Sequence, residues 1–239
     1  MNQTMPQAIP KIVANKKQRS DELSRITVLS FMEQHPLLVD IENNEDINLH
    51  TITAEHEVTH DSHLLQSNLS VQSELLLQSD LVVVVYQRAH VDSAGYVSRR
   101  EIIDDNYIAT IWLNIDEMGA YNTLAALRFI NHMATVLNQN NLLKFNISDI
   151  SSLVSNSKSL RFFEASCEDD SLSIAANDSM ADSAAMIIVT KEPISIRKIN
   201  AGFAVINQVC EHKVPCYYGV HMSPKYTAKH TYLYLVGER

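Results

Sequence analysis

The chain has 239 residues, of which 46% are apolar, and a formal net charge of −9 at pH 7. This length and apolar content are sufficient for a globular protein with a sizeable core. The negative charge argues against nucleic acid as a partner, because its phosphates would be repelled. No apolar run approaches the roughly 20 residues of a membrane span, so no membrane association is expected.

The first segment, residues 1–20, is predicted to be a flexible tail. It holds two prolines and four basic side chains but no apolar core, so it lacks the pattern of a signal peptide. The chain has three cysteines, an odd number without a Cys-x-x-Cys pair, which is typical of a reducing compartment rather than a disulfide framework. These features predict a cytoplasmic protein.

The next segment is predicted to form the first elements of an α/β domain. A helix capped by Ser20 and ending near His35 is expected, with a strand at Arg25–Phe31 as the alternative. Leu37–Ile41 reads as a short strand, and Glu42–His63 as a polar loop with at most one short element.

Two strands are predicted in the middle of the chain. Asp80–Gln87 contains four consecutive valines, which is typical of a strand that is buried on both faces in a parallel sheet covered by helices. Tyr107–Ile115 is the second strand. His90–Asn106, between them, is expected to be a polar connection.

A long helix is predicted to follow, beginning at Asp116 or Asn122 and ending near Asn138. Apolar residues cover two adjacent faces of this helix, so it is expected to pack on two sides.

The later elements are a helix, two strands, a helix and two strands, at Asp149–Asn156, Leu160–Ser166, Ala184–Thr190, Ser195–Cys210, Val214–Met222 and Lys229–Val236. Ser195 is expected to cap the second of these helices, whose apolar face would hold Ile196, Ile199, Phe203, Ile206 and Cys210. The last two strands are expected to be joined directly by a turn. The predicted fold is therefore α/β: a reduced parallel-type sheet with helices, a long central helix and a C-terminal β-α-β-β domain.

Glycine is scarce: the chain has only five, and no two lie closer than 17 positions. Dinucleotide fingerprints, Walker loops and nucleophile elbows need glycines a few positions apart, where the backbone approaches a phosphate or adopts a positive φ. None of these motifs can be drawn on the sequence. We therefore predict no nucleotide or other cofactor.

One histidine-rich segment matches a metal motif. His56-Glu57-Val58-Thr59-His60 has the H-E-x-x-H pattern of zinc hydrolases, and His63 would be a third ligand. On a helix, two histidines four residues apart share a face and bind zinc while the glutamate activates water. The surrounding residues are polar and β-branched, which weakens a helix. A solvated loop is the preferred interpretation, and a zinc-dependent hydrolase is the alternative.

Tyrosines concentrate near the C-terminus. They predict either half-buried sheet positions or an interaction face. These five residues are Tyr217, Tyr218, Tyr226, Tyr232 and Tyr234.

The order of elements from the long helix onward resembles FtsZ and its tubulin relatives. In that family a long central helix runs into a loop patterned roughly G-x-x-N-x-D-F-x-D, and a small mixed domain follows. On this sequence Asn141 replaces the glycine, Lys144 the asparagine and Asn146 the first acid, while Asp149 matches the second acid. The resemblance covers roughly residues 107–239 and extends, with less detail, to residues 80–100.

In the family, two acids of this loop enter the nucleotide pocket of the next subunit and help to polarise the water that attacks GTP. The resemblance implies that Asn141, Lys144, Asn146 and Asp149 face a partner subunit. Asn146 carries no negative charge, and the glycine-rich GTP signature of the family is missing. GTP hydrolysis is therefore not expected.

These inferences predict a shortened, GTPase-deficient relative of FtsZ rather than an enzyme. Its expected parts are a tail at 1–20, a reduced α/β domain at 21–140 and an FtsZ-like domain at 141–239. It would act by protein–protein contact, capping, copolymerising with or regulating a cell-division or cytoskeletal filament, or by self-assembly, and FtsZ is one candidate partner. The other alternative is an accessory structural protein of a mobile element with a generic α/β fold.

Overall fold

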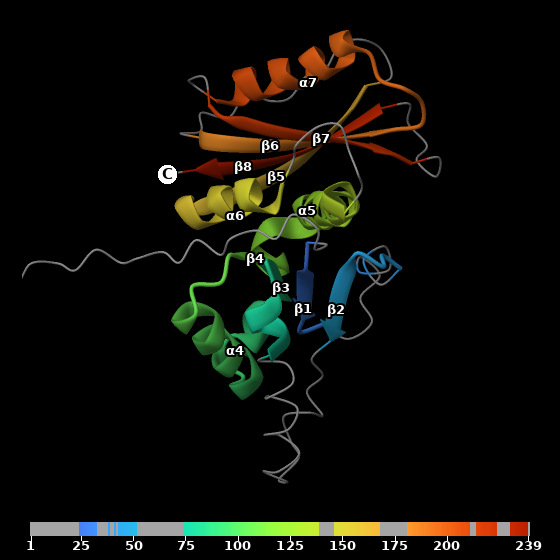
Figure 1. Ribbon diagram of the computed structural model, residues 1–239. Coiled ribbons are helices and arrows are strands. Elements are labelled where there is room, and N and C mark those ends of the chain that lie inside the picture. The colour runs from blue at the N-terminus through green and yellow to red at the C-terminus, as the bar shows by residue number, and fades with distance from the viewer. Residues whose placement is uncertain are drawn as a thin grey trace, which may run out of the picture.

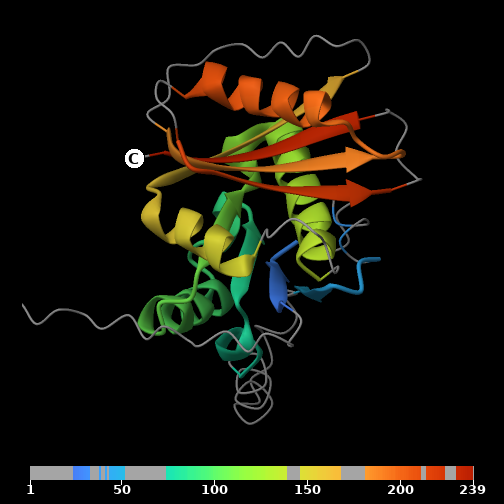
Figure 2. The same ribbon diagram turned by 45° about the horizontal axis from the view of Figure 1, so that its top comes forward.

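The computed structural model describes residues 24–32, 38, 41, 43–51, 74–138, 146–167, 181–210, 214–223 and 230–238. In these ranges two four-stranded sheets lie on either side of a long helix, and further helices cover their outer faces (Figures 1 and 2). The predicted tail and the predicted boundary between residues 140 and 141 lie outside the described residues.

The N-terminal sheet is parallel throughout. Its strands are β1 (Ile26–Ser30), β2 (Ile47–Thr51), β3 (Leu81–Tyr86) and β4 (Thr110–Asn114), in the order β2-β1-β3-β4. All residues of β1 and the first five of β3 are buried, because helices cover both faces of the sheet. The prediction from the valine run is confirmed.

Two predictions in the N-terminal part are wrong. The helix predicted from Ser20 to His35 is a strand at residues 26–30, as the alternative stated. Five consecutive buried side chains suit a central strand, whereas a surface helix buries only one stripe. The strand predicted at Leu37–Ile41 is the second, because Leu38 and Ile41 have helical rather than extended backbone. The edge strand β2 is the one short element allowed for in the segment Glu42–His63.

The predicted polar connection at His90–Asn106 is also wrong, because it contains helix α4 (Ala94–Asp105). The Ser93 hydroxyl caps this helix by accepting a hydrogen bond from the backbone N–H of Tyr96. Tyr96 and Ile103 are its buried apolar residues, and they pack on the outer face of the sheet. So few apolar positions leave no helical period to read from the sequence.

The central helix α5 (Ile115–Asn138) and helix α6 (Ile147–Asn156) fill the space between the two sheets. Gly119 has φ 73° and ψ 161°, so α5 is kinked after its first turn. The two start points proposed for this helix lie on either side of the kink. Side chains of α5 contribute to a core that also contains residues of both sheets, so the predicted packing on two sides is confirmed.

The C-terminal sheet is mixed. Its strands are β5 (Ser159–Cys167), β6 (Ala181–Thr190), β7 (Cys216–Met222) and β8 (His230–Glu238), in the order β5-β8-β6-β7. Strand β7 is parallel to β6, and β8 is antiparallel to both β5 and β6. The last two strands are therefore not neighbours, because β6 lies between them.

Helix α7 (Ile196–Val209) covers the outer face of the C-terminal sheet, and Ser195 caps it as predicted. Val205, Ile206 and Val209 are buried against the sheet, but Ile196 is 77% exposed and lies off the apolar face assigned to it. The predicted fold class is confirmed. Within the residues described, no helix is both long enough and apolar enough to cross a lipid bilayer.

Candidate functional site

Two of the four residues assigned to partner contact form the start of helix α6. Asn146 Oδ1 accepts the backbone N–H of Asp149 at 3.0 Å, and Asp149 Oδ2 accepts the backbone N–H of Asn146 at 3.4 Å. This reciprocal pair is a capping box, which satisfies donors at the helix start. Burial raises the pKa of the Asp149 carboxyl, and the hydrogen bond from Asn146 opposes that shift. Asn141 and Lys144 lie outside the described residues.

The middle of α6 lies at the amino end of the parallel sheet. The Ser151 hydroxyl donates to the backbone carbonyl of Asp80, the residue before β3, at 3.2 Å. At the same end, the backbone N–H of Ser24 donates to Asn138 Oδ1 at 2.8 Å, which ties the last turn of α5 to the start of β1. Because α5 begins directly after β4, it runs from the carboxyl end of the sheet to the amino end.

The carboxyl end of the sheet is where ligands bind in open parallel folds. The chain leaves β1 toward β2 on one side and leaves β3 toward β4 on the other, so the strand order reverses between β1 and β3. A nucleotide crevice is expected at this point, beside the loop after β3, residues 87–93. A phosphate site there needs backbone N–H groups that point outward and are not already bonded.

Five of the seven backbone N–H groups of the loop at 87–93 donate to groups within the chain. The Gln87 N–H donates to His90 Nδ1 at 3.2 Å, and the Arg88 N–H donates to Asp116 Oδ2 at 2.9 Å. The N–H groups of His90, Val91 and Ser93 donate to carbonyls within the same loop. The Asp116 carboxylate also places a negative charge beside it, which disfavours a phosphate.

Comparison with solved structures identifies this arrangement of two sheets around a central helix. FtsZ from M. jannaschii matches with a TM-score of 0.63 for a tryptophan-to-tyrosine mutant, at 8% identity over 91% of this chain and 91% of that chain. The chain has the FtsZ fold. An empty FtsZ dimer from the same organism matches with a TM-score of 0.66 at 8% identity, over 92% of this chain and 89% of that chain.

The FtsZ fold is shared with CetZ from Methanosaeta thermophila, which matches with a TM-score of 0.53 at 10% identity, over 89% of this chain and 86% of that chain. The likeness extends well beyond the residues 107–239 from which the sequence suggested it. No protein-family model and no curated protein matches the sequence.

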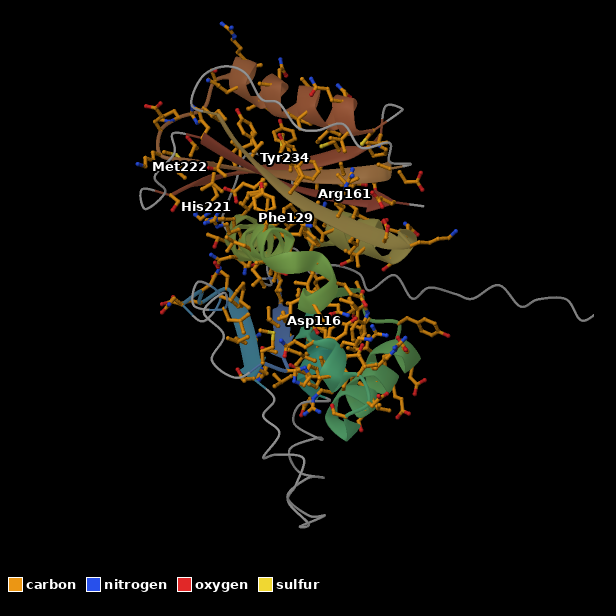
Figure 3. All side chains as sticks on the ribbon, turned by 180° about the vertical axis from the view of Figure 1, so that it is seen from behind. Asp116, Phe129, Arg161, His221, Met222 and Tyr234 are labelled. Atoms are coloured by element: carbon orange, nitrogen blue, oxygen red, sulfur yellow. The ribbon has the colours of Figure 1, made fainter. Side chains whose placement is uncertain are left out.

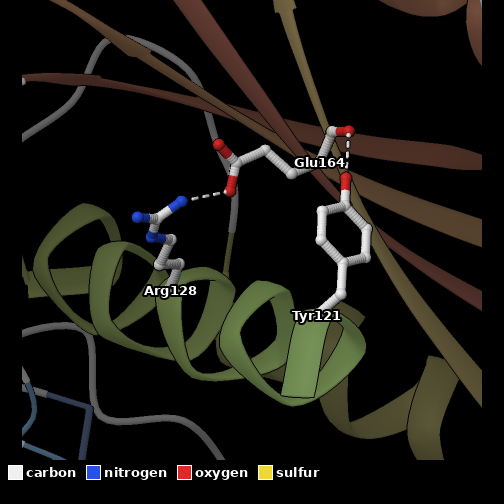
Figure 4. A network of polar contacts seen from close by, with 3 residues as sticks. All are labelled: Tyr121, Arg128 and Glu164. Carbon is white, nitrogen blue, oxygen red and sulfur yellow. Dashed lines mark hydrogen bonds and ion pairs between the residues drawn. The ribbon is translucent and has the colours of Figure 1, made fainter. Parts of the chain in front are cut away.

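Within the FtsZ fold, a polar network joins the central helix to the edge strand β5 (Figure 4). Arg128 of α5 forms a 2.7 Å ion pair with the Glu164 carboxylate, and the Tyr121 hydroxyl donates to the backbone carbonyl of Glu164 at 3.3 Å. The Glu164 side chain is only 17% exposed, so this charge pair is better shielded from water than a surface pair. The network holds the C-terminal sheet on α5.

The C-terminal tyrosines divide into packing residues and half-exposed ones. Tyr232 and Tyr234 are fully buried under α7, where their hydroxyls donate to the backbone carbonyls of Lys198 and Gly202 at 3.0 and 3.3 Å. For these two, sheet packing is confirmed and an interaction face is wrong. Tyr217 and Tyr218 are half-buried, and Tyr226 lies outside the described residues.

The candidate zinc ligands His56, His60 and His63 all lie outside the described residues. In the part of the chain that the structure does describe, no group of three or more histidine, cysteine or acidic side chains could hold a metal ion.

Sequence reasoning missed the bond between Arg88 and Asp116, because they are 28 positions apart and Asp116 was read only as a helix start. It also missed the capping role of Asn146 and Asp149. Here a local signal exists, since a capping side chain followed three positions later by an acid is the pattern of a capping box.

Proposed function

We propose that this chain is a GTPase-deficient, FtsZ-like cytoplasmic protein that acts by protein–protein contact and caps, copolymerises with or regulates a filament. The FtsZ fold supports this proposal, and one of the matching FtsZ structures is a dimer. FtsZ itself is the first partner to test.

The observation that carries the GTPase deficiency is the loop after β3. Five of its seven backbone N–H groups are hydrogen-bonded within the chain, and Asp116 adds a negative charge beside the loop. The five scattered glycines support the same conclusion, because no segment offers the flexible backbone of a phosphate cradle.

The two ends of the N-terminal sheet differ, which favours capping. Asn146 and Asp149 start α6, which lies at the amino end, and we assign them, together with Asn141 and Lys144 of the preceding segment, to the partner contact. The loop at 87–93 occupies the carboxyl end. A head-to-tail filament uses two different surfaces, so a subunit with only one competent end stops growth.

The first prediction is that a substoichiometric amount of this protein lowers the extent of FtsZ polymerisation measured by light scattering. Asp149→Asn removes the negative charge but keeps an oxygen that accepts the Asn146 N–H, so it should weaken inhibition without unfolding α6. Asp104→Asn, the same change on the exposed side of α4, is the matched control and should inhibit like the unmodified protein. Unchanged polymerisation at an equimolar ratio would exclude capping.

The second prediction is that the purified chain retains neither GTP nor GDP in equilibrium dialysis, whereas FtsZ, as the positive control, does. The physical reason is the bonded loop and the Asp116 charge. Stoichiometric nucleotide on this chain would exclude the GTPase-deficient proposal and leave the fold unaffected.

A further inference from the structure

Two histidines from different layers of the molecule share a hydrogen bond. His132 lies on the central helix α5 and His221 on strand β7, and their Nδ1 atoms are 2.7 Å apart. The ring centroids are 4.9 Å apart, with an interplanar angle of 59°. Figure 3 labels His221 close to the central helix. At this distance one ring donates its Nδ1 proton to the bare Nδ1 of the other, so the contact holds one proton between the two nitrogens.

The charged groups around the pair come from the segment before β2, from α5 itself and from β5. Asp46, on the segment before β2, acts on His221, and its Oδ1 accepts the Asn138 amide at 3.2 Å. Arg128, one turn earlier on α5, acts on His132 and is itself paired with Glu164 of β5. The segment before β2, the central helix and the C-terminal sheet therefore meet around these two rings.

The protein environment disfavours protonation of both rings. Burial, together with His221 and Arg128, lowers the pKa of His132 to about 3. Burial also lowers the pKa of His221, although the Asp46 charge opposes this shift. His132 is only 6% exposed, so water can do little to stabilise a charge there.

We propose that His132 and His221 form an acid-sensitive latch that holds β7 on the central helix and releases it when both rings are protonated. Two imidazolium rings both carry an Nδ1–H, so neither can accept the bond, and their like charges repel at 2.7 Å. Among the described strands, β7 is the outermost of its sheet and pairs only with β6, so it is the strand that such a change can release locally.

The direction of the pH effect follows from proton counting. Once β7 has moved away, both rings return to an ordinary pKa of about 6.5, so below this pH the open state binds more protons than the closed state. The equilibrium constant for opening therefore rises as pH falls, about tenfold per pH unit for one extra proton and about a hundredfold for two. The latch depends on the contact alone and not on the proposed function.

The test is amide hydrogen exchange on the full chain near pH 7 and near pH 5, corrected for the intrinsic exchange rate. We expect protection of Cys216–Met222 to fall at least tenfold at the lower pH while Leu81–Tyr86 stays protected. His221→Asn leaves His132 as the one ring of the pair that gains a proton on opening, so it should reduce the pH dependence in β7 from that of two protons to that of at most one. His50→Asn, which removes another half-buried histidine, on β2, is the matched control and should behave like the unmodified protein. Equal β7 protection at both pH values, or a fall in His221→Asn as large as in the unmodified protein, would overturn the proposal.

A second measurement on the unmodified chain does not depend on a variant folding. Nitrogen NMR of the histidine rings should show one protonated and one bare Nδ1 near pH 7, and a joint loss of the bare Nδ1 as β7 opens. Two rings that titrate independently near their ordinary pKa, with β7 still closed, would contradict the latch.

Discussion

Phe129→Ala is expected to lower the free energy of unfolding by about 3–5 kcal/mol. Phe129 is fully buried on the central helix, and its ring packs edge-on against Phe162 of β5 with centroids 5.8 Å apart. The residue belongs to a core that both sheets share, so the cavity would remove contacts from both at once. Urea unfolding followed by circular dichroism measures the change.

The matched control for Phe129→Ala is Tyr121→Ala on the same helix. Tyr121 is 66% exposed and makes one hydrogen bond, to the Glu164 carbonyl, so its removal should cost less than about 1 kcal/mol. The fluorescence of Trp112, in β4, should follow the same transition as circular dichroism if the shared core unites the two sheets. If Phe129→Ala and Tyr121→Ala lowered the free energy of unfolding by similar amounts, Phe129 would not be a main contact of a core shared by both sheets.

Gly202→Ala is expected to destabilise the protein by about 1–3 kcal/mol, although alanine is the better helix former. A Cβ at this position would lie 2.5 Å from Met186 Sδ and 2.8 Å from Tyr232 Cδ1. Helix α7 cannot retreat without cost, because the hydroxyls of Tyr232 and Tyr234 are bonded to its backbone. The measurement is again the free energy of unfolding in urea.

Ala204→Gly, at an exposed position two residues further along α7, isolates helix propensity from packing. Ala204→Gly should lower the free energy of unfolding by about 1 kcal/mol. Gly202→Ala and Ala204→Gly would then both destabilise the protein, although the first adds a Cβ atom and the second removes one. On a Met186→Ala background, Gly202→Ala should cost less, because the clashing sulfur is gone. An increase in stability for Gly202→Ala would show that the helix adjusts freely.

The local sequence pattern was sufficient to predict an element wherever that element has a clear side-chain period or a capping residue. The valine run of β3, the two apolar faces of α5 and the Ser195 cap of α7 were all readable from the sequence. Helix α4 was not, because Tyr96 and Ile103 are too few to set a period, and β1 was ambiguous because five residues satisfy either pattern.

By itself the sequence determined the α/β class, the long central helix and the order of the C-terminal elements, because these follow from side-chain period, caps and glycine content over short windows. Only the tertiary structure decided that β6 separates β7 from β8, that the Arg88 N–H meets Asp116, and that His132 meets His221 across 89 positions. The physical reason is that these partners are brought together by the packing of whole layers. The residues that neighbour each partner in the chain therefore carry no information about which distant residue it will meet.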